Sequence, residues 1–157
     1  MTATTNQSKC APGVSVSAVD VNNESLALTG SNKAIIKGIS NLKVATTATA
    51  KNSATITSIA AYCGGVKLTG ATVTFNGATS DDVYVIVTDS RGYSTRVDDD
   101  SLSLISYISP SVIPTISRDT PTGDKVTVNV SGKWYNGSFG AIRNTIRLRV
   151  AYMPADS

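Results

Sequence analysis

The amino-acid sequence predicts an all-β fold, and both its composition and its hydrophobic patterning support this. The 157 residues include 20 Thr, 20 Ser, 16 Val and 12 Ile, but only 7 Leu, one Glu and one Gln. β-Branched residues favour strands, whereas Leu, Glu and Gln favour helices, so few amphipathic helices are expected. Apolar and polar residues also alternate with a period of two in several segments, which is typical of strands with one face in the core.

The composition also argues against most hydrolase chemistry. Histidine is absent, so a Ser-His-Asp or Cys-His nucleophile system and a His-ligated zinc or haem cannot be built. The ten Asp and one Glu show no spacing that singles out a general acid and a general base. No glycine-rich phosphate-binding loop occurs. We therefore expect a non-enzymatic structural or binding protein.

Charge, cysteines and hydropathy give expectations about partners. The net charge is +3 and its Lys and Arg are scattered, so nucleic-acid binding is not expected. Cys10 and Cys63 form either one disulfide or two separate thiols, and the polar segment around Cys10 favours separate thiols. The sequence has neither a run of roughly 18 apolar residues nor an apolar N-terminal segment, so neither membrane insertion nor a signal peptide is expected.

The first part of the chain predicts a polar leader and four strands. Residues 1–12 are polar and lead to Gly13, which is typical of a flexible leader. Apolar and polar residues then alternate over three segments, and residues 34–39 favour a short strand or bend. The alternating segments are residues 14–18, 42–50 and 54–62, and the turns between strands are predicted at Asn22-Asn23, residues 29–32, residues 51–53 and Gly64-Gly65.

Three further strands are predicted before the acidic run at residue 98. Residues 71–75 form the first, followed by Asn76-Gly77, a hairpin-type dipeptide. Residues 81–88 form the most strongly predicted strand, because most of its positions are β-branched or aromatic. Residues 89–92, with the sequence Asp-Ser-Arg-Gly, predict a tight turn with Asp as the cap and Gly left-handed. Residues 93–97 return as the partner strand.

Residues 13–104 have the size and strand spacing of an immunoglobulin-like β-sandwich. About seven strands over roughly ninety residues, with turn signals every eight to twelve residues, are typical of that fold. The internal Cys and Trp of antibody domains are absent, which favours the disulfide-free, fibronectin-III-like variety. The predicted fold class is therefore an all-β, immunoglobulin/fibronectin-III-like β-sandwich.

Residues 105–157 are expected to form a second, incomplete β module. Pro110, Pro114 and Pro121 stiffen an extended entry segment at residues 112–118. A strand is predicted at residues 125–130, followed by a loop at residues 131–140. The last strand, residues 145–152, is expected to turn Ile146, Leu148 and Val150 inward, with Arg147 and Arg149 outward. Three or four strands are too few for a sandwich, so this unit is a truncated module, packs on the first domain or is completed by another chain.

An acidic run provides the candidate metal site. Asp98, Asp99 and Asp100 lie near the boundary between the two modules, and Asp81, Asp82 and Asp89 belong to the same first module. Carboxylate-rich clusters of this kind bind Ca²⁺. Consecutive strand residues point to opposite faces, however, so three adjacent Asp reach one ion only across a bend. Solvated charge and protection of a sheet edge are the alternative interpretations.

The aromatic loop at residues 134–139 provides the candidate carbohydrate site. Trp134, Tyr135 and Phe139 lie among Asn, Gly and Ser, and exposed aromatic rings beside amides and hydroxyls suit stacking on sugars. A single Trp is equally often a core anchor. We favour a core position for Trp134 and leave Tyr135 and Phe139 open between the two roles.

Four stretches, taken in order, resemble one family. They are VNNESLALTG at residues 21–30, LKVATTATAKNSATI at residues 42–56, VTDSRG at residues 87–92 and GSFGAIRNT at residues 137–145. Together they are similar to the repeated immunoglobulin-like modules in minor structural tail and tail-tip proteins of siphophages that infect Gram-positive bacteria.

The resemblance implies a virion component of the tail tip, baseplate or fibre that spaces or presents a host-recognition element. It implies other tail proteins as partners, a possible homo-oligomer, and assembly in the host cytoplasm. It carries over no catalytic residue and no cofactor, so Ca²⁺ rests only on the acidic run. The alternative function is a carbohydrate-binding module for host cell-wall glycan, and a secreted adhesin stiffened by calcium is a third hypothesis.

Overall fold

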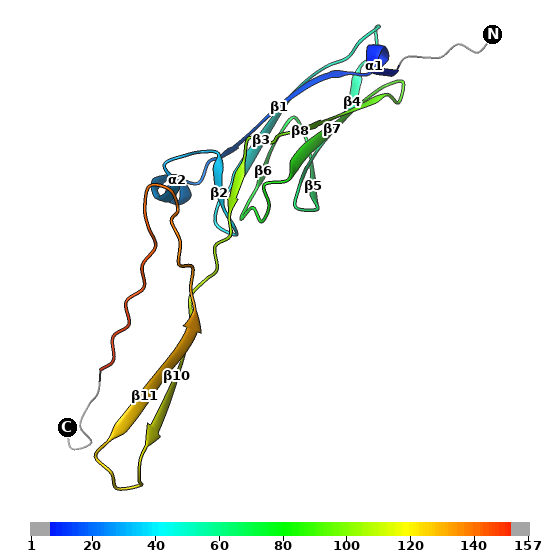
Figure 1. Cartoon of the computed structure of the whole chain (residues 1–157). Coiled ribbons are helices and arrows are strands. Elements are labelled where there is room, and N and C mark those ends of the chain that lie inside the picture. The colour runs from blue at the N-terminus through cyan, green and yellow to red at the C-terminus, as the bar shows by residue number, and fades with distance from the viewer. Residues whose placement is uncertain (1–6, 152–157) are drawn as a thin grey trace.

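The computed structural model describes residues 7–151, and most of its regular structure is antiparallel β-strand (Figure 1). The prediction of an all-β fold is therefore confirmed. In chain order, the helices and strands are α1 (Gln7–Cys10), β1 (Gly13–Asp20), α2 (Asn23–Thr29), β2 (Ala34–Ile36), β3 (Leu42–Thr49), β4 (Ile56–Cys63), β5 (Val66–Thr69), β6 (Thr72–Phe75), β7 (Val83–Asp89), β8 (Ser94–Asp98), β9 (Ser103–Ile105), β10 (Ser111–Arg118) and β11 (Val126–Lys133).

Two larger sheets, a short parallel pair formed by β2 and β9, and one core make up the first module. One sheet has the strand order β1-β3-β6 and the other has the order β5-β4-β7-β8. Side chains of both sheets meet in one buried cluster, because each strand contributes its apolar face. The cluster consists of Ala18, Ile35, Leu42, Val44, Ala61, Cys63, Phe75, Ala78, Val83 and Val85.

The strands with the clearest alternation form where they are predicted. In β3 the side chains of Leu42, Val44 and Thr46 are buried and those between them are exposed. In β7 every second residue from Val83 to Asp89 is buried. Gly64 and Gly65, with φ of 55° and 83°, connect β4 to β5 in a two-residue turn. Positive φ at both positions is the type I′ requirement, which glycine meets without strain.

The strand predicted at residues 71–75 forms as β6, but the hairpin expected at Asn76-Gly77 does not. A further short strand, β5, precedes it and was not predicted; β5 pairs with β4 and β6 pairs with β3, so the two belong to different sheets. The crossing takes place at Gly70, whose φ is 139°. Asn76-Gly77 does not join a hairpin, because β6 and β7 also lie in different sheets. The Gly77 N–H instead donates to Asn41 Oδ1 at 3.1 Å.

Helix α2 was not predicted from the sequence. The Asn22 side chain caps it by accepting hydrogen bonds from the N–H groups of Glu24 and Ser25. Gly30 ends it in the left-handed region, with φ of 68°. These are the usual start and stop signals of a helix. Neither helix of the described chain is long enough to cross a membrane.

The second unit is a two-stranded ribbon attached to one end of the first module (Figure 1). Strand β9 pairs in parallel with β2, and the chain then leaves the module through residues 106–110. The segment expected to be an extended entry is strand β10, which pairs with β11 over eight residue pairs. Pro114 is accepted within β10 because each strand of a two-stranded ribbon has a free edge.

The expected last strand is not formed in the described residues. Residues 144–150 have no strand assignment, and Ile146, Leu148 and Val150 are 36%, 60% and 65% exposed. The prediction that these three side chains point into a core is therefore wrong. An alternating segment buries its apolar side fully only when a facing sheet covers it, and here the two-stranded hairpin covers it only in part. Tyr152, also expected in this strand, lies outside the described residues.

Candidate functional site

The three consecutive aspartates at the end of β8 point to different partners. The exposed Asp98 forms an ion pair with Arg96, in which Nη2 and Oδ1 are 2.6 Å apart. Asp99 turns toward β1 and accepts a hydrogen bond from the Ala18 N–H at 2.8 Å. Asp100 is exposed. The structure therefore does not bring the three carboxylates together, because the strand ends at Asp98 and the next two residues follow the chain into a turn.

Asp99 has a structural role between the two sheets. Its carboxylate also accepts from the Ser101 N–H at 3.0 Å and lies 3.8 Å from Lys33 Nζ. Burial alone would raise the pKa of Asp99, but the hydrogen bonds from Ser101 and Ala18 and the charge of Lys33 outweigh burial, so its pKa is lowered.

The other aspartates of the first module add no ligand cluster. Asp81 accepts from the Leu104 N–H at 3.1 Å, and Asp89 lies in the turn between β7 and β8. Between residues 7 and 151, no three His, Cys, Asp or Glu side chains gather in a metal-binding arrangement.

Two of the three aromatic residues of the predicted carbohydrate site belong to an internal cluster. The rings of Tyr135 and Phe139 have centroids 5.1 Å apart, and Tyr107 lies 6.1 Å from Tyr135 and 5.9 Å from Phe139. Phe139 is only 5% exposed, so it has no free ring face for a sugar. The Tyr135 hydroxyl donates to the Ser138 carbonyl at 2.9 Å. These rings pack the second unit against the chain that leaves the first module.

The same loop also binds the end of helix α2. The Ile142 N–H donates to the Leu28 carbonyl at 3.2 Å, which pairs one of the last carbonyls of the helix. Gly140 lies so close to the helix that an added Cβ would be 2.6 Å from the Thr29 carbonyl oxygen. Its φ of 114° also favours glycine. We call residues 137–142 the anchor loop, because they fix the second unit on the first.

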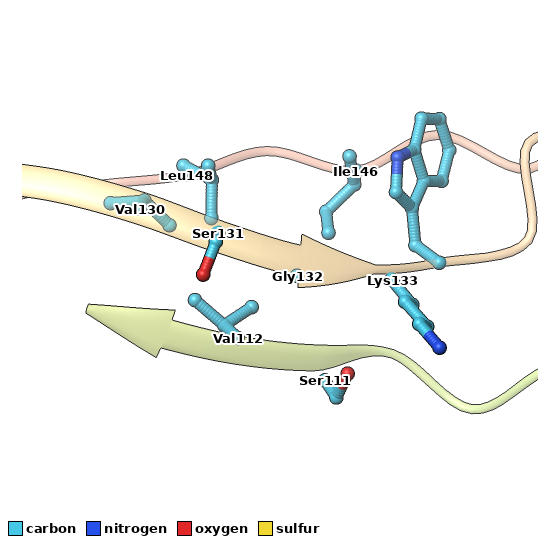
Figure 2. Close-up of a pocket in the computed structure, with 9 residues that line it drawn as sticks. Ser111, Val112, Val130, Ser131, Gly132, Lys133, Ile146 and Leu148 are labelled. Atoms are coloured by element: carbon cyan, nitrogen blue, oxygen red, sulfur yellow. The ribbon is translucent and has the colours of Figure 1, made fainter.

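Trp134 follows β11 and lies outside this aromatic cluster. It is partly buried and lines a cavity of about 170 Å³ together with Val112, Val130, Ile146 and Leu148. Figure 2 shows Ile146 and Leu148 on the segment that runs beside β11, above the two strands. The side chain of Trp134 is therefore part of the wall between this segment and the hairpin.

The cavity at Trp134 continues into a longer apolar groove. Cross-strand partners in an antiparallel pair point to the same face, so the register of β10 and β11 places six apolar side chains on one face. With Leu148, Arg149, Val150 and Ala151 of the neighbouring segment, this face encloses about 510 Å³. We call it the hairpin groove; its floor is Val112, Pro114, Ile116, Val126, Val128 and Val130.

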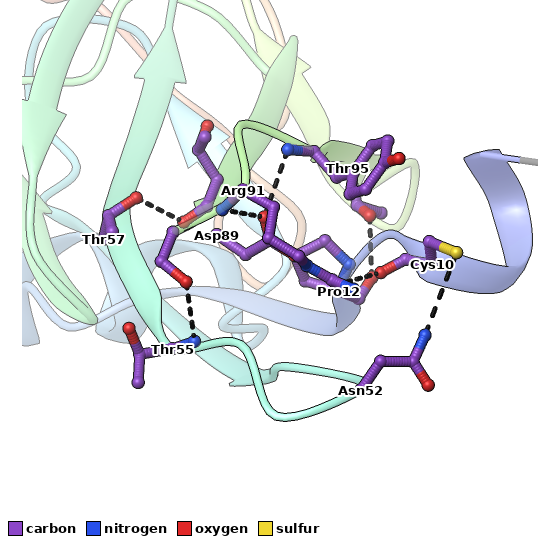
Figure 3. Close-up of polar contacts among 11 residues, drawn as sticks. Cys10, Pro12, Asn52, Thr55, Thr57, Asp89, Arg91 and Thr95 are labelled. Atoms are coloured by element: carbon purple, nitrogen blue, oxygen red, sulfur yellow. Dashed lines mark hydrogen bonds and ion pairs between the residues drawn. The ribbon is translucent and has the colours of Figure 1, made fainter. Parts of the chain in front are cut away.

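A polar cluster at the opposite end of the molecule was only partly expected (Figure 3). The buried Asp89 carboxylate accepts from the Arg91 N–H at 2.9 Å and from Arg91 Nη2 at 2.7 Å. Arg91 Nη2 also donates to the Cys10 carbonyl at 2.8 Å, and the Thr95 hydroxyl donates to the Pro12 carbonyl at 2.7 Å. The turn was predicted from the sequence Asp-Ser-Arg-Gly, but the hydrogen bonds that Arg91 and Thr95 donate to residues 10 and 12 were not.

The two cysteines are separate thiols. Cys10 lies at this polar cluster, where Asn52 Nδ2 is 3.8 Å from its sulfur. Cys63 is buried in the core, its thiol donates to the Ser80 carbonyl at 3.3 Å, and burial raises its pKa. A buried thiol with a raised pKa is a poor nucleophile, so Cys63 serves packing.

A row of aromatic and cationic side chains on the outer face of the larger sheet was also missed. Tyr62 and Tyr84 are cross-strand partners whose rings stack with centroids 4.6 Å apart. Arg96 lies over Tyr84 and Lys67 lies over Tyr62, at 3.7 Å and 5.9 Å from the ring centroids. Only the strand register reveals this row, because its members are far apart in sequence. The faces of the two rings are therefore already in contact with each other and with the two cations.

The hairpin groove is thus an extended, exposed apolar surface of the second unit, and the anchor loop connects that unit to α2. Comparisons with protein-family models, with curated proteins and with solved structures found no match to this chain.

Proposed function

We propose that the chain is a non-enzymatic structural module of a bacteriophage tail, in the tail tip, baseplate or fibre. In this role it spaces or presents a host-recognition element and contacts other tail proteins, with assembly in the host cytoplasm. Support comes from the sequence resemblance to siphophage tail proteins and from the arrangement of the two units.

We infer an immunoglobulin-like or fibronectin-III-like sandwich for residues 13–104. Seven of its strands divide into sheets of three and four that share one core. The chain changes sheet between β3 and β4, between β5 and β6, and between β6 and β7. A sandwich of this kind forms from alternating strands with frequent sheet changes.

The end-to-end arrangement is the observation that carries the proposal. Helix α1 lies at one end of the molecule and the turn of the β10–β11 hairpin at the other (Figure 1). The anchor loop contacts helix α2 through Ile142 and Gly140, so the two units also meet away from the covalent connection at residues 106–110. A module with its ends apart and its joint fixed suits a spacer, because it transmits position along a fibre.

Localisation on the virion tests the proposal. Antibodies against the 157-residue chain would be used for immunogold labelling of phage particles purified from a lysed culture that carries the gene. We expect label confined to the tail and peptides of the chain in the mass spectrum of the particles. Particles of full infectivity without the chain would contradict a tail role.

A further inference from the structure

The hairpin groove leaves an unusually continuous apolar face in water. Eight Val, Ile and Leu side chains on the hairpin and the neighbouring segment are each 36% to 72% exposed, whereas the opposite face of the hairpin is mostly Ser, Thr, Asn and Lys. Contiguous apolar patches on soluble proteins mark interaction sites. The eight are Val112, Ile116, Val126, Val128, Val130, Ile146, Leu148 and Val150.

The first module shows what covers a face of this kind. Strands β1 and β3 pair antiparallel over eight residues, as β10 and β11 do. In the first module the next strand, β4, lies in the facing sheet and pairs with β7, whose Val83 and Val85 complete the core. In the second unit, residues 145–151 follow the hairpin and line its groove, but no described strand takes the place of β7.

The segment at residues 145–151 is also free to pair. Within the described chain, its residues form no backbone hydrogen bond with one another or with the hairpin. An extended segment with unpaired N–H and C=O groups accepts a further strand by main-chain hydrogen bonding, and an adjacent apolar groove selects its side chains.

We propose that the hairpin groove is a docking site for an extended β-strand of another polypeptide, with alternating Val or Ile residues and acidic ends. This strand would take the position that β7 has in the first module. The proposal adds a type of partner to the tail role above. It concerns binding alone, so it is tested without virions and can fail independently of that role.

Charge favours such a strand over a second copy of this chain. Residues 106–151 contain six Lys and Arg and two Asp, which gives a net charge of +4, and both Asp lie between β10 and β11. Arg118 lies on the groove face by its register with Val126, and Arg149 lines the groove. Two copies would bring these cations together, whereas carboxylates at the ends of a strand would neutralise them. Strand β7 has this character: Asp81 and Asp82 precede it, and Asp89 ends it.

The test is a titration of the full chain with a synthetic peptide of residues 81–89, DDVYVIVTD. Trp134 is the sole Trp of the sequence and lines the cavity at the end of the groove, so its fluorescence reports binding. We expect saturable binding with a shift of Trp emission to shorter wavelength, and no saturation with a scrambled peptide of the same composition.

Two substitutions on the same strand provide the variant and its matched control. Ile116 and Ile113 are 72% and 62% exposed, but by register Ile116 faces the groove and Ile113 faces away. Ile116→Asp is expected to weaken peptide binding about tenfold or more, while Ile113→Asp leaves it unchanged.

Three results would overturn the proposal. The first is the absence of saturable peptide binding while the circular dichroism spectrum shows a folded chain. The second is an equal loss of binding in both variants. The third is sedimentation showing that the free chain dimerises and that Ile116→Asp abolishes this, since a second copy would then be the occupant.

Discussion

Asp89 lies fully buried at the turn between β7 and β8, where an unpaired carboxylate would be costly. Burial alone would raise the pKa of Asp89. The side-chain and backbone hydrogen bonds from Arg91, the backbone hydrogen bond from Tyr93 and the charge of Arg91 outweigh burial, so the pKa of Asp89 is lowered. The carboxylate therefore organises the turn in its charged form and, through Arg91, holds the Cys10 carbonyl.

This lowered pKa makes part of the stability sensitive to acid. The unfolded chain protonates Asp near its ordinary pKa of about 3.9, so the contribution of Asp89 is complete above that pH and is lost as the pH falls through the lower folded-state pKa. We predict that Asp89→Asn lowers the melting temperature at pH 7, and that its difference from the wild type shrinks as the pH falls below about 3.9. Thermal melts from pH 7 to pH 2.5 would measure this.

Asp124→Asn is the control for this experiment, because Asp124 is exposed in the connection between β10 and β11. It should follow the wild-type curve. A difference between wild type and Asp89→Asn that stays constant down to pH 2.5 would show that the charge of Asp89 contributes nothing.

Phe139 is the buried ring of the anchor loop and packs against Tyr107 and Tyr135. Truncation of a buried Phe costs about 3–5 kcal/mol, and we expect the loss of this packing to loosen the loop that contacts α2. We predict that Phe139→Ala greatly accelerates hydrogen exchange of the Ile142 amide, which donates to the Leu28 carbonyl.

Tyr135→Phe is the matched control, since it keeps the ring and removes only the exposed hydrogen bond to Ser138. It should change Ile142 exchange little. Unaltered Ile142 exchange in Phe139→Ala would mean that the loop is held without the aromatic cluster.

At the scale of elements, α2 shows how a helix can lack an apolar period. Its buried residues, Ser25 and Thr29, are four positions apart but polar, and the Ser25 hydroxyl donates to the buried Asp20 carboxylate. Composition and hydropathy therefore gave no helical signal. The capping residues Asn22 and Gly30 were visible in the sequence and, with Glu24 in the first turn, were the signal available.

Both the oxygen and the nitrogen of the Asn22 side-chain amide form hydrogen bonds that support α2. Its oxygen caps the helix, and its Nδ2 donates to the Ile39 carbonyl at 2.9 Å. We predict that Asn22→Ala lowers the free energy of unfolding by about 1–2 kcal/mol, as measured by urea denaturation. Asn23→Ala, at an exposed first helical position, should change it by less than about 0.5 kcal/mol. Equal effects of the two substitutions would remove the capping explanation.

Some strands could be predicted from their own sequence pattern, whereas others depend on which neighbouring strand they pair with. Strands β3 and β7 follow from their own alternation, because a half-buried strand records its buried side in its sequence. The separation of β5 from β6 depends on which sheet each joins, which alternation does not record. For residues 145–151, alternation was present but no facing sheet covers it.

At the scale of the whole molecule, the candidate sites depend on how the two units meet. The sequence indicated an aromatic loop and an acidic run, but the positions of Tyr107, α2 and β1 decide which side chains are exposed. Tyr107 packs against Phe139, α2 contacts the anchor loop at Ile142 and Gly140, and β1 receives Asp99. The hairpin groove was not predicted, because it arises from the register of two strands and the course of a third segment.

No described side chain after Leu104 belongs to the core of the first module. We therefore expect this module to fold stably without the second unit. A variant that ends at Ile105 keeps the whole buried cluster and the pairing of β2 with β9. We therefore predict that this variant unfolds in one cooperative transition with protected amides in β4 and β7. The last turn of α2 should exchange faster than in the full chain, because the Leu28 carbonyl loses its partner Ile142 and the Gly140 contact with Thr29 is removed.

In the full chain, amides of β11 should exchange faster than those of β4. All eight β11 residues are exposed, and among residues 7–151 β11 pairs only with β10, whereas β4 has partners on both sides. Hydrogen exchange followed by mass spectrometry measures all three regions at once. An unfolded shortened variant would show that the second unit is needed to stabilise the first. Equal protection of β11 and β4 in the full chain would show instead that a second copy of the chain covers the hairpin in solution.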